Sequence, residues 1–183
     1  SINNPEFQYF VAAAIVIFFL GIKDDIMILS ASKKFIGQLI AAAIIIHFGG
    51  IQITNMHGFM GIEALPPVAG IVLSFFTIIV ITNSFNLIDG VDGLAGTLGL
   101  ITTIALGTYF LSAGQTAYAV LAFSLTGSII GFLIYNFSPA KIFMGDTGAL
   151  LLGLVCSILA IKFIELHNVI EGSPYTFRSA PSI

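Results

Sequence analysis

The sequence predicts an all-α fold, that of a polytopic membrane protein with about six transmembrane helices. Of the 183 residues, 57% are hydrophobic and 8% are charged, whereas about a quarter of the residues in a soluble domain carry a charge. The apolar residues form continuous blocks between short polar segments, without the alternation typical of barrel strands. Because lipid offers no hydrogen bonds to the backbone, such blocks favour helices.

Six apolar blocks give the expected helices in chain order. They cover residues 7–22, 35–51, 67–81, 94–111, 117–135 and 149–164. Several are shorter than the roughly 20 residues that cross a bilayer core, and flanking glycines and polar residues can supply the missing turn. We expect residues 1–183 to form a single integral-membrane domain that is truncated at both ends, as an internal piece of a longer protein.

The charged residues separate between the two ends of the expected bundle. Because successive helices alternate in direction, segments 23–34, 82–93 and 136–148 share one side of the membrane. This side holds all five aspartates and four of the six basic residues: Asp24, Asp25, Asp89, Asp92, Asp146, Lys23, Lys33, Lys34 and Lys141. The positive-inside rule makes it the cytoplasmic side. Ionisable residues at such helix ends are candidate functional groups.

The first polar segment on this side places two adjacent carboxylates ahead of two lysines. It reads GIKDDI at 21–26, followed by SKKF at 32–35. Neighbouring carboxylates repel one another unless a lysine or a metal lies close, and a metal–polyphosphate complex would relieve that repulsion. A solvated pair at a helix end is the alternative.

The second segment repeats oxygen-bearing side chains every three residues. It reads NSFNLIDGVDGLA at 83–95, which would place four such residues on one face of a helix or its frayed end: Asn83, Asn86, Asp89 and Asp92. Hard oxygen donors suit magnesium or manganese, not zinc. The single cysteine excludes a cysteine-rich metal site. An asparagine-capped turn with a glycine stop is the alternative.

The third segment leads into the last apolar block and reads NFSPAKIFMGDTG at 136–148. Asp146 or Thr147 can cap that helix. Alternatively, a helix N-terminus with glycines and a nearby lysine can bind phosphate, with Asp146 holding a magnesium ion that bridges the phosphates. Phe143 can stack on a base. The pattern favours a functional role for this segment.

In order, the three segments resemble the signatures of the polyprenyl-phosphate N-acetylhexosamine-1-phosphate transferases, glycosyltransferase family 4. They match an Asp-Asp motif, an Asn-x-x-Asn-x-x-Asp-Gly-x-Asp-Gly-Leu-Ala motif and an Asn-x-x-Pro-Ala-x-x-Phe-Met-Gly-Asp motif. The second is more similar to the branch that transfers N-acetylglucosamine-1-phosphate than to the muramoyl-pentapeptide branch. Members of the family also carry earlier helices and a later His-rich cytoplasmic motif, which this chain does not contain.

The resemblance implies a role for each matched residue. Asp146 and Asn86 would bind Mg²⁺, with Mn²⁺ as an alternative metal, and Asp89 would assist. Asp92 and Phe143 would bind the uracil end, with Asn136 nearby, and Asn83 would belong to the substrate-binding set. Lys34, ahead of Lys33, would contact phosphate. Asp24 and Asp25 would organise the lipid phosphate and the metal for direct attack, in preference to forming a covalent intermediate.

The implied reaction transfers N-acetylhexosamine-1-phosphate from a UDP-sugar to a polyprenyl phosphate such as undecaprenyl phosphate and releases UMP, which would initiate cell-envelope polysaccharide synthesis. The enzyme would lie in the bacterial cytoplasmic membrane with its active site facing the cytoplasm. Its expected partners are the two substrates and the membrane; a homodimer is an option, and nucleic acid is not expected.

Three other classes fit the sequence less well. A CDP-alcohol phosphotransferase requires an arginine shortly after its Asp-Gly pair, where this chain has Gly96 and Thr97. An intramembrane aspartyl protease requires Gly-x-Gly-Asp, but Phe143 occupies the first glycine's position. A transporter would use carboxylates near mid-membrane and inverted repeats, which the sequence does not display.

Overall fold

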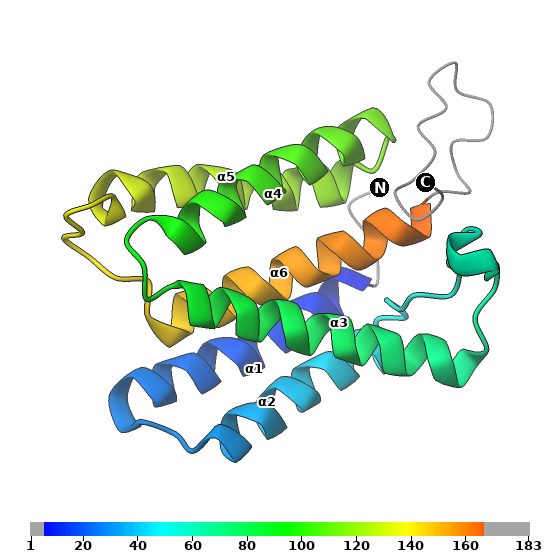
Figure 1. Cartoon of the computed structure of the whole chain (residues 1–183), viewed down its shortest axis with the longest axis horizontal. Helices are drawn as coiled ribbons and strands as arrows, with labels where there is room; N and C mark the ends of the chain where they lie inside the picture. The colour runs from blue at the N-terminus through cyan, green and yellow to red at the C-terminus, as the bar shows by residue number, and fades with distance from the viewer. Residues whose placement is uncertain (1–5, 167–183) are drawn as a thin grey trace.

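The computed structural model describes residues 6–166 and consists of helices joined by short connections (Figure 1). The long helices, in chain order, are α1 (Glu6–Met27), α2 (Ala31–Ala43), α3 (Pro67–Ile88), α4 (Leu94–Ser112), α5 (Thr116–Asn136) and α6 (Gly145–Glu165). A π-helical turn, η1 (Ile44–Phe48), extends α2, and a short 3₁₀ turn, η2 (Phe59–Gly61), lies in the connection to α3. The all-α fold class is confirmed.

Five helical segments of the described part are long and apolar enough to cross a membrane: Ala31–Phe48, Pro67–Ile88, Leu94–Ser112, Thr116–Asn136 and Gly145–Glu165. α1, with 22 residues, packs against both α2 and α6. The only β-pairing among residues 6–166 is a single bridge between Asn55 and Ala64. The helices of the structure therefore agree with the predicted class, a multi-pass membrane protein.

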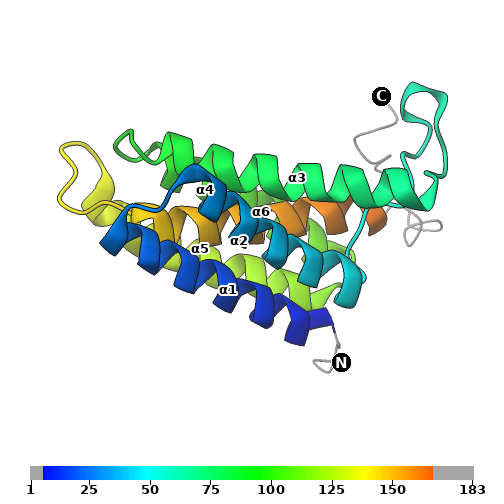
Figure 2. The ribbon, with the colours of Figure 1, turned by 90° about the horizontal axis from the view of Figure 1, so that it is seen from below.

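α6 is the central helix of the bundle. It packs against α1, α3 and α4, as Figures 1 and 2 show, while α4 and α5 form a hairpin along one side. Close approach of α3 to α6 depends on Gly153, because a Cβ there would lie 2.6 Å from the Cα of Thr82. Small residues at such crossings let membrane helices gain packing contacts.

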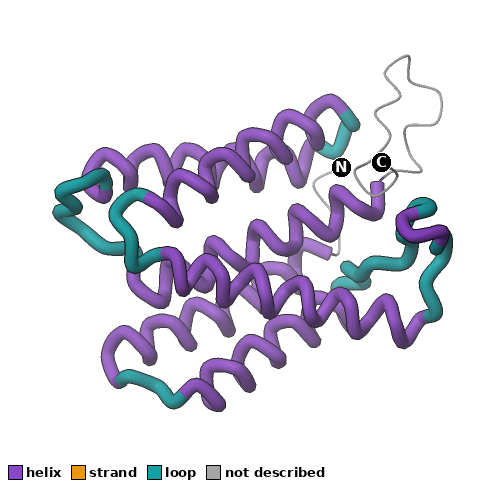
Figure 3. The backbone as a smooth tube through the Cα atoms, viewed as in Figure 1, coloured by secondary structure: helices purple, strands orange, loops and turns teal. Residues whose placement is uncertain are grey.

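The connections gather at the two ends of the bundle (Figure 3). The α1–α2, α3–α4 and α5–α6 connections lie at one end, on the left in Figure 1, and the α2–α3 and α4–α5 connections lie at the other. The first end carries the aspartates of the three polar segments, and we call it the aspartate end.

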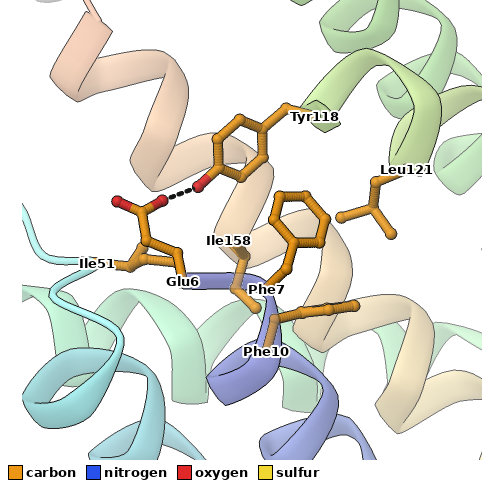
Figure 4. Close-up of a pocket in the computed structure, with 7 residues that line it drawn as sticks. All are labelled: Glu6, Phe7, Phe10, Ile51, Tyr118, Leu121 and Ile158. Carbon is orange, nitrogen blue, oxygen red and sulfur yellow. Dashed lines mark hydrogen bonds between the residues drawn. The ribbon is translucent and has the colours of Figure 1, made fainter. Parts of the chain in front are cut away.

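The opposite end is held by a polar contact between α1, α5 and α6. The Tyr118 hydroxyl donates a hydrogen bond to Glu6 beside Phe7 and Phe10 (Figure 4), and Lys162 Nζ donates to Glu6 Oε1 over 2.9 Å. Nearby, the α2–α3 connection is tied to the end of α6, since the backbone N–H of Thr54 donates to Glu165 over 2.6 Å. Both contacts fasten the end remote from the aspartates.

The helices extend beyond the apolar blocks at the aspartate end. α1 continues through Asp24 and Asp25 to Met27, α3 continues to Ile88, and α6 begins at Gly145. Hydropathy marks where lipid ends, whereas a helix continues until the backbone is interrupted, as by the positive φ of 68° at Gly145. Asp24, Asp25 and Asp146 are consequently carried on helical ends, whereas Asp92 and Lys141 lie in the connections.

Candidate active site

Lys34 lies between two aspartates from different helices. Its ammonium group forms an ion pair with Asp24 and lies 3.5 Å from each carboxylate oxygen of Asp146. Asp24 is only 3% exposed and also accepts the backbone N–H of Leu29 over 2.6 Å. Lys33 is exposed. Of the two lysines, Lys34 is therefore the one directed into the site.

Asp25 binds the first turn of α6. Its carboxylate accepts the backbone N–H of Asp146 over 2.8 Å and that of Thr147 over 3.1 Å, and it also accepts the Thr147 hydroxyl. The first N–H groups of a helix have no partner within it and favour a negative charge. The alternative in which Asp146 or Thr147 caps α6 does not hold, because both lie inside its first turn and a carboxylate from α1 supplies the cap.

Asn86 and Asp146 are in direct contact. The Asn86 side-chain amide on α3 donates to Asp146 Oδ1 on α6. Asp89 follows at the C-terminal end of α3. Burial raises the pKa of Asp89, a hydrogen bond from the backbone of Gly145 lowers it, and the charges of Asp146 and Asp25 raise it further. The aspartate end thus concentrates negative charge that a cation would offset.

The Asn83 side chain joins α3 to α2 and does not point toward Asp146 as Asn86 does. Its amide donates to Gln38 Oε1 over 2.6 Å and to the carbonyl of Ile79 over 2.8 Å, and its oxygen accepts from Gln38 Nε2 over 3.3 Å. Both amide hydrogens and the oxygen of Asn83 are thereby engaged inside the bundle.

Asp92 and Asn136 join the two loops that follow α3 and α5. Asn136, 3% exposed, accepts the N–H of Gly93 over 3.0 Å and donates to the carbonyl of Ile142 over 2.9 Å. Asp92 accepts the N–H of Ala140 over 3.1 Å. Phe143, in the second of these loops, is 70% exposed, so its ring face is available to a ligand.

The four residues spaced by three do not form one ligand face, which corrects that expectation. Asn83 contacts α2, Asn86 contacts α6, and Asp92 contacts the α5–α6 loop. The helix ends at Ile88, and Gly93 has a positive φ of 73°, so the chain turns before Asp92 is reached. A threefold spacing keeps side chains on one face only while the helix continues.

The oxygen donors of Asp146 and Asn86 suit a Mg²⁺ ion whose remaining ligands come from water and substrate phosphates. Within the described residues, no three His, Cys, Asp or Glu side chains come together as a metal site. However, Asp146 is in contact with Asn86, and both provide hard oxygen donors. Mg²⁺ commonly binds through one or two carboxylates together with water and substrate phosphates. Asp146 and Asn86 would hold the ion in this way.

Two residues of the site had no assigned function in the sequence pattern. The sequence motifs do not include Gln38, and Thr147 entered only as a possible cap of its own helix. A polar residue four positions after Lys34, in the otherwise apolar remainder of α2, was the available signal for Gln38, because such spacing places both on one face. No comparable signal connects Thr147 with Asp25.

The fold and this arrangement define an integral-membrane protein with a cluster of carboxylates, amides and one lysine at one end of its bundle. Comparison of the sequence with known proteins identifies the protein family. The sequence profile of glycosyl transferase family 4 matches residues 7–164, and the chain belongs to that family.

Similar proteins in bacteria carry names from two branches. The chain is 41% identical over 167 residues to a probable undecaprenyl-phosphate N-acetylglucosaminyl 1-phosphate transferase of Bacillus subtilis, covering 86% of this chain and 45% of that protein. It is 37% identical over 154 residues to a decaprenyl-phosphate N-acetylglucosaminephosphotransferase of Mycobacterium tuberculosis, covering 78% and 38%. A phospho-N-acetylmuramoyl-pentapeptide-transferase of Moorella thermoacetica is 44% identical over 108 residues, covering 58% and 34%. The chain spans less than half the length of each of these relatives.

Proposed function

We propose that this protein transfers N-acetylhexosamine-1-phosphate, with N-acetylglucosamine as the sugar, from a UDP-sugar to a polyprenyl phosphate and releases UMP. The family membership and the names of the similar proteins support a polyprenyl-phosphate sugar-1-phosphate transferase. The single observation that carries the proposal is the meeting of Lys34 and Asn86 at Asp146, because it joins cationic and oxygen-donor groups from three helices at one point.

Both substrates are anions, so the site must offset their repulsion. Mg²⁺, held by Asp146 and Asn86, would neutralise diphosphate charge in the transition state. Lys34 supplies a fixed positive charge to phosphate oxygens, and Asp24 holds that lysine in place through their ion pair. Asp25 contributes by fixing the first turn of α6, which carries Asp146.

The chemistry we propose is a direct displacement. An oxygen of the lipid phosphate forms a bond to the β-phosphorus of the UDP-sugar, and the bond from that phosphorus to the α–β bridging oxygen breaks. UMP leaves with the bridging oxygen, and the lipid keeps a diphosphate that carries the sugar. Because a phosphate monoester has a second pKa of about 6, it is mostly ionised at neutral pH and needs no strong base. Asp24 and Asp25 therefore act as organising groups.

The nucleotide is proposed to bind over the joined loops. The exposed ring of Phe143 can stack on uracil, and the Asp92 carboxylate, one oxygen of which accepts from Ala140, can accept a hydrogen bond from uracil with the other. Asn136, which is buried, fixes the loops that carry these two residues. This separates a nucleotide end from the phosphate end at Lys34.

The proposed location is the bacterial cytoplasmic membrane, with the aspartate end facing the cytoplasm. The positive-inside rule supports this orientation, since Lys23, Lys33, Lys34 and Lys141 belong to that end.

The muramoyl-pentapeptide sugar is the second candidate, because relatives named for it also match the chain. The test uses membranes that contain the full-length protein, Mg²⁺, undecaprenyl phosphate and a UDP-sugar labelled in its β-phosphate. We expect label from UDP-N-acetylglucosamine to enter the lipid, with one UMP released per transfer. Transfer from the muramoyl-pentapeptide donor alone would overturn the sugar assignment, and transfer from neither donor would overturn the proposed function.

A further inference from the structure

Gln38 and Asn83 form a reciprocal amide pair between α2 and α3. Each side chain donates to the other, over 3.3 Å from Gln38 Nε2 and over 2.6 Å from Asn83 Nδ2. Gln38 is only 2% exposed. A buried amide that loses its partner is costly, so the two helices are held at the one alignment in which both amides are satisfied.

Lys34 and Asn86, which both contact Asp146, lie one helical turn closer to the aspartate end than Gln38 and Asn83 do. Lys34 precedes Gln38 by four residues on α2, which begins at the aspartate end. Asn86 follows Asn83 by three residues on α3, which ends there. Residues three or four apart share a helix face. Aligning Gln38 with Asn83 therefore also aligns Lys34 with Asn86.

Both aligned groups then converge on the same carboxylate. Lys34 Nζ lies 3.5 Å from the oxygens of Asp146, and the Asn86 amide contacts Asp146 Oδ1. Sliding α2 along α3 by a single turn, about 5.4 Å, would carry Lys34 out of reach of Asp146. The other buried residues of α2, Ala41 and Ala42, are apolar and supply no comparable directional bond.

We propose that Gln38 and Asn83 are positioning residues that set the alignment of α2 on α3 and so place Lys34 and Asn86 together at Asp146. The inference rests on the proposed function for the identity of the metal and substrates. It also gives Asn83 a different role from the substrate contact expected from the family resemblance, because the hydrogen-bonding groups of that side chain are used within the bundle.

The test compares three variants of the full-length protein: Gln38→Met, Asn83→Ala, and the exchange Gln38→Asn with Asn83→Gln. The exchange moves one methylene group from α2 to α3 and keeps two facing amides. For each, purified protein is titrated with Mg²⁺ alone, and the rise in thermal unfolding temperature gives the half-saturating concentration. Sugar-phosphate transfer is measured over the same Mg²⁺ range.

We expect each single variant to raise the half-saturating Mg²⁺ concentration about 10-fold or more, the effect typical of losing groups that orient metal ligands. The exchange should return it to near the wild-type value. Unchanged Mg²⁺ concentrations in both single variants, or an exchange no better than either single variant, would overturn the inference. If Gln38→Met does not accumulate in membranes, the comparison of Asn83→Ala with the exchange decides alone.

Ser74→Ala is the matched control for a purely structural loss. Ser74 is fully buried on α3, accepts the N–H of Ile53 over 2.8 Å and lies toward the opposite end of the helix. This variant should lower the unfolding temperature at every Mg²⁺ concentration without moving the half-saturation point. An equal shift of that point in Ser74→Ala would mean that general loosening explains the effect, and would overturn the inference.

The two proposals fail separately in this design. Wild-type transfer combined with unshifted Mg²⁺ titrations rejects the positioning role and leaves the proposed function standing. Absence of wild-type transfer combined with shifted titrations rejects the proposed function and supports the positioning role, because the unfolding measurement requires no substrate.

Discussion

Asp25 and Thr147 lie on different helices, yet the carboxylate of Asp25 accepts both the backbone N–H and the hydroxyl of Thr147. The C-terminal end of α1 thereby caps the N-terminal end of α6. Since Asp146 precedes Thr147, this contact fixes the backbone of the residue on which Lys34 and Asn86 converge. The acidic pair of the first polar segment has a structural task in addition to its proposed catalytic one.

Removing the cap should loosen the start of α6. We expect Asp25→Ala to lower the free energy of unfolding by about 0.5–2 kcal/mol, the usual effect of losing a helix N-cap. Hydrogen exchange at the amides of Asp146 and Thr147 should accelerate. Thr147→Val, which removes only the hydroxyl donor, should have a smaller effect. Unchanged exchange at both amides in Asp25→Ala would contradict the cap.

The contact between Asp25 and Thr147 also depends on close approach of α1 to α6 at Gly21. A Cβ at this position would lie 2.4 Å from Thr147 Cα, so Gly21→Ala must push the helices apart. Overpacking of this kind costs about 1–3 kcal/mol, and we expect transfer activity to fall as well. Thermal unfolding and the transfer assay measure both effects.

Gly127→Ala is the control for this substitution, because a Cβ at Gly127 on α5 would meet no atom within 4 Å. Replacing a glycine inside a helix should stabilise the protein by about 0.5–1 kcal/mol there. A Gly21→Ala protein as stable and active as Gly127→Ala would show that the close approach is not required.

Asp89 should make stability fall with rising pH in the absence of Mg²⁺. Burial raises its pKa, so the folded state holds this proton at pH values where the unfolded chain has lost it. The folded state is therefore favoured below the unfolded pKa, and this advantage is lost as pH rises through the higher, folded value.

Asp89→Asn removes that titration while keeping an oxygen that can accept from Gly145. With a chelator present, the variant should unfold at a higher temperature than the wild type, and the difference should grow through this pH range. Thermal unfolding across pH measures it. A difference that is constant with pH would exclude Asp89 as its source.

At the opposite end, Glu6 accepts from Lys162 and Tyr118. Glu6→Gln weakens the contact with a lysine side chain that is only 15% exposed. We expect a loss of about 1–3 kcal/mol of stability, the usual cost of leaving a buried group poorly paired. Adding Lys162→Met should restore part of it. Mg²⁺ affinity should remain at the wild-type value, and a change in it would link this contact to the site.

The sequence predicted the class of fold and the gathering of the aspartates at one end, since both follow from apolar blocks and alternating helix direction. It did not predict which side chains meet across helices. The pairs Asp25 with Thr147 and Gln38 with Asn83 depend on how each helix is rotated about its axis. In helices that are apolar on every face, hydrophobicity does not distinguish the face turned to lipid from the face turned to protein.

The polar motifs also had a limit as a guide to geometry. Spacing by three suggested one ligand face on α3, but the helix ends at Ile88, and Asp92 lies beyond it and bonds to Ala140 in the α5–α6 loop. Asn86 and Asp146 do lie in contact, and their role as metal ligands stays a prediction. Backbone breaks at glycines, more than side-chain spacing, decide where such residues point.

The most direct test of the account measures Mg²⁺-dependent transfer of sugar-phosphate to undecaprenyl phosphate by full-length wild type and Asp146→Ala at equal amounts of folded protein. Because loss of groups that merely orient metal ligands costs about 10–100-fold, removing the proposed ligand itself should reduce transfer by more than about 100-fold. The rise in unfolding temperature with Mg²⁺ should vanish with it. An Asp146→Ala protein that retains wild-type transfer and Mg²⁺ response would contradict the central claim.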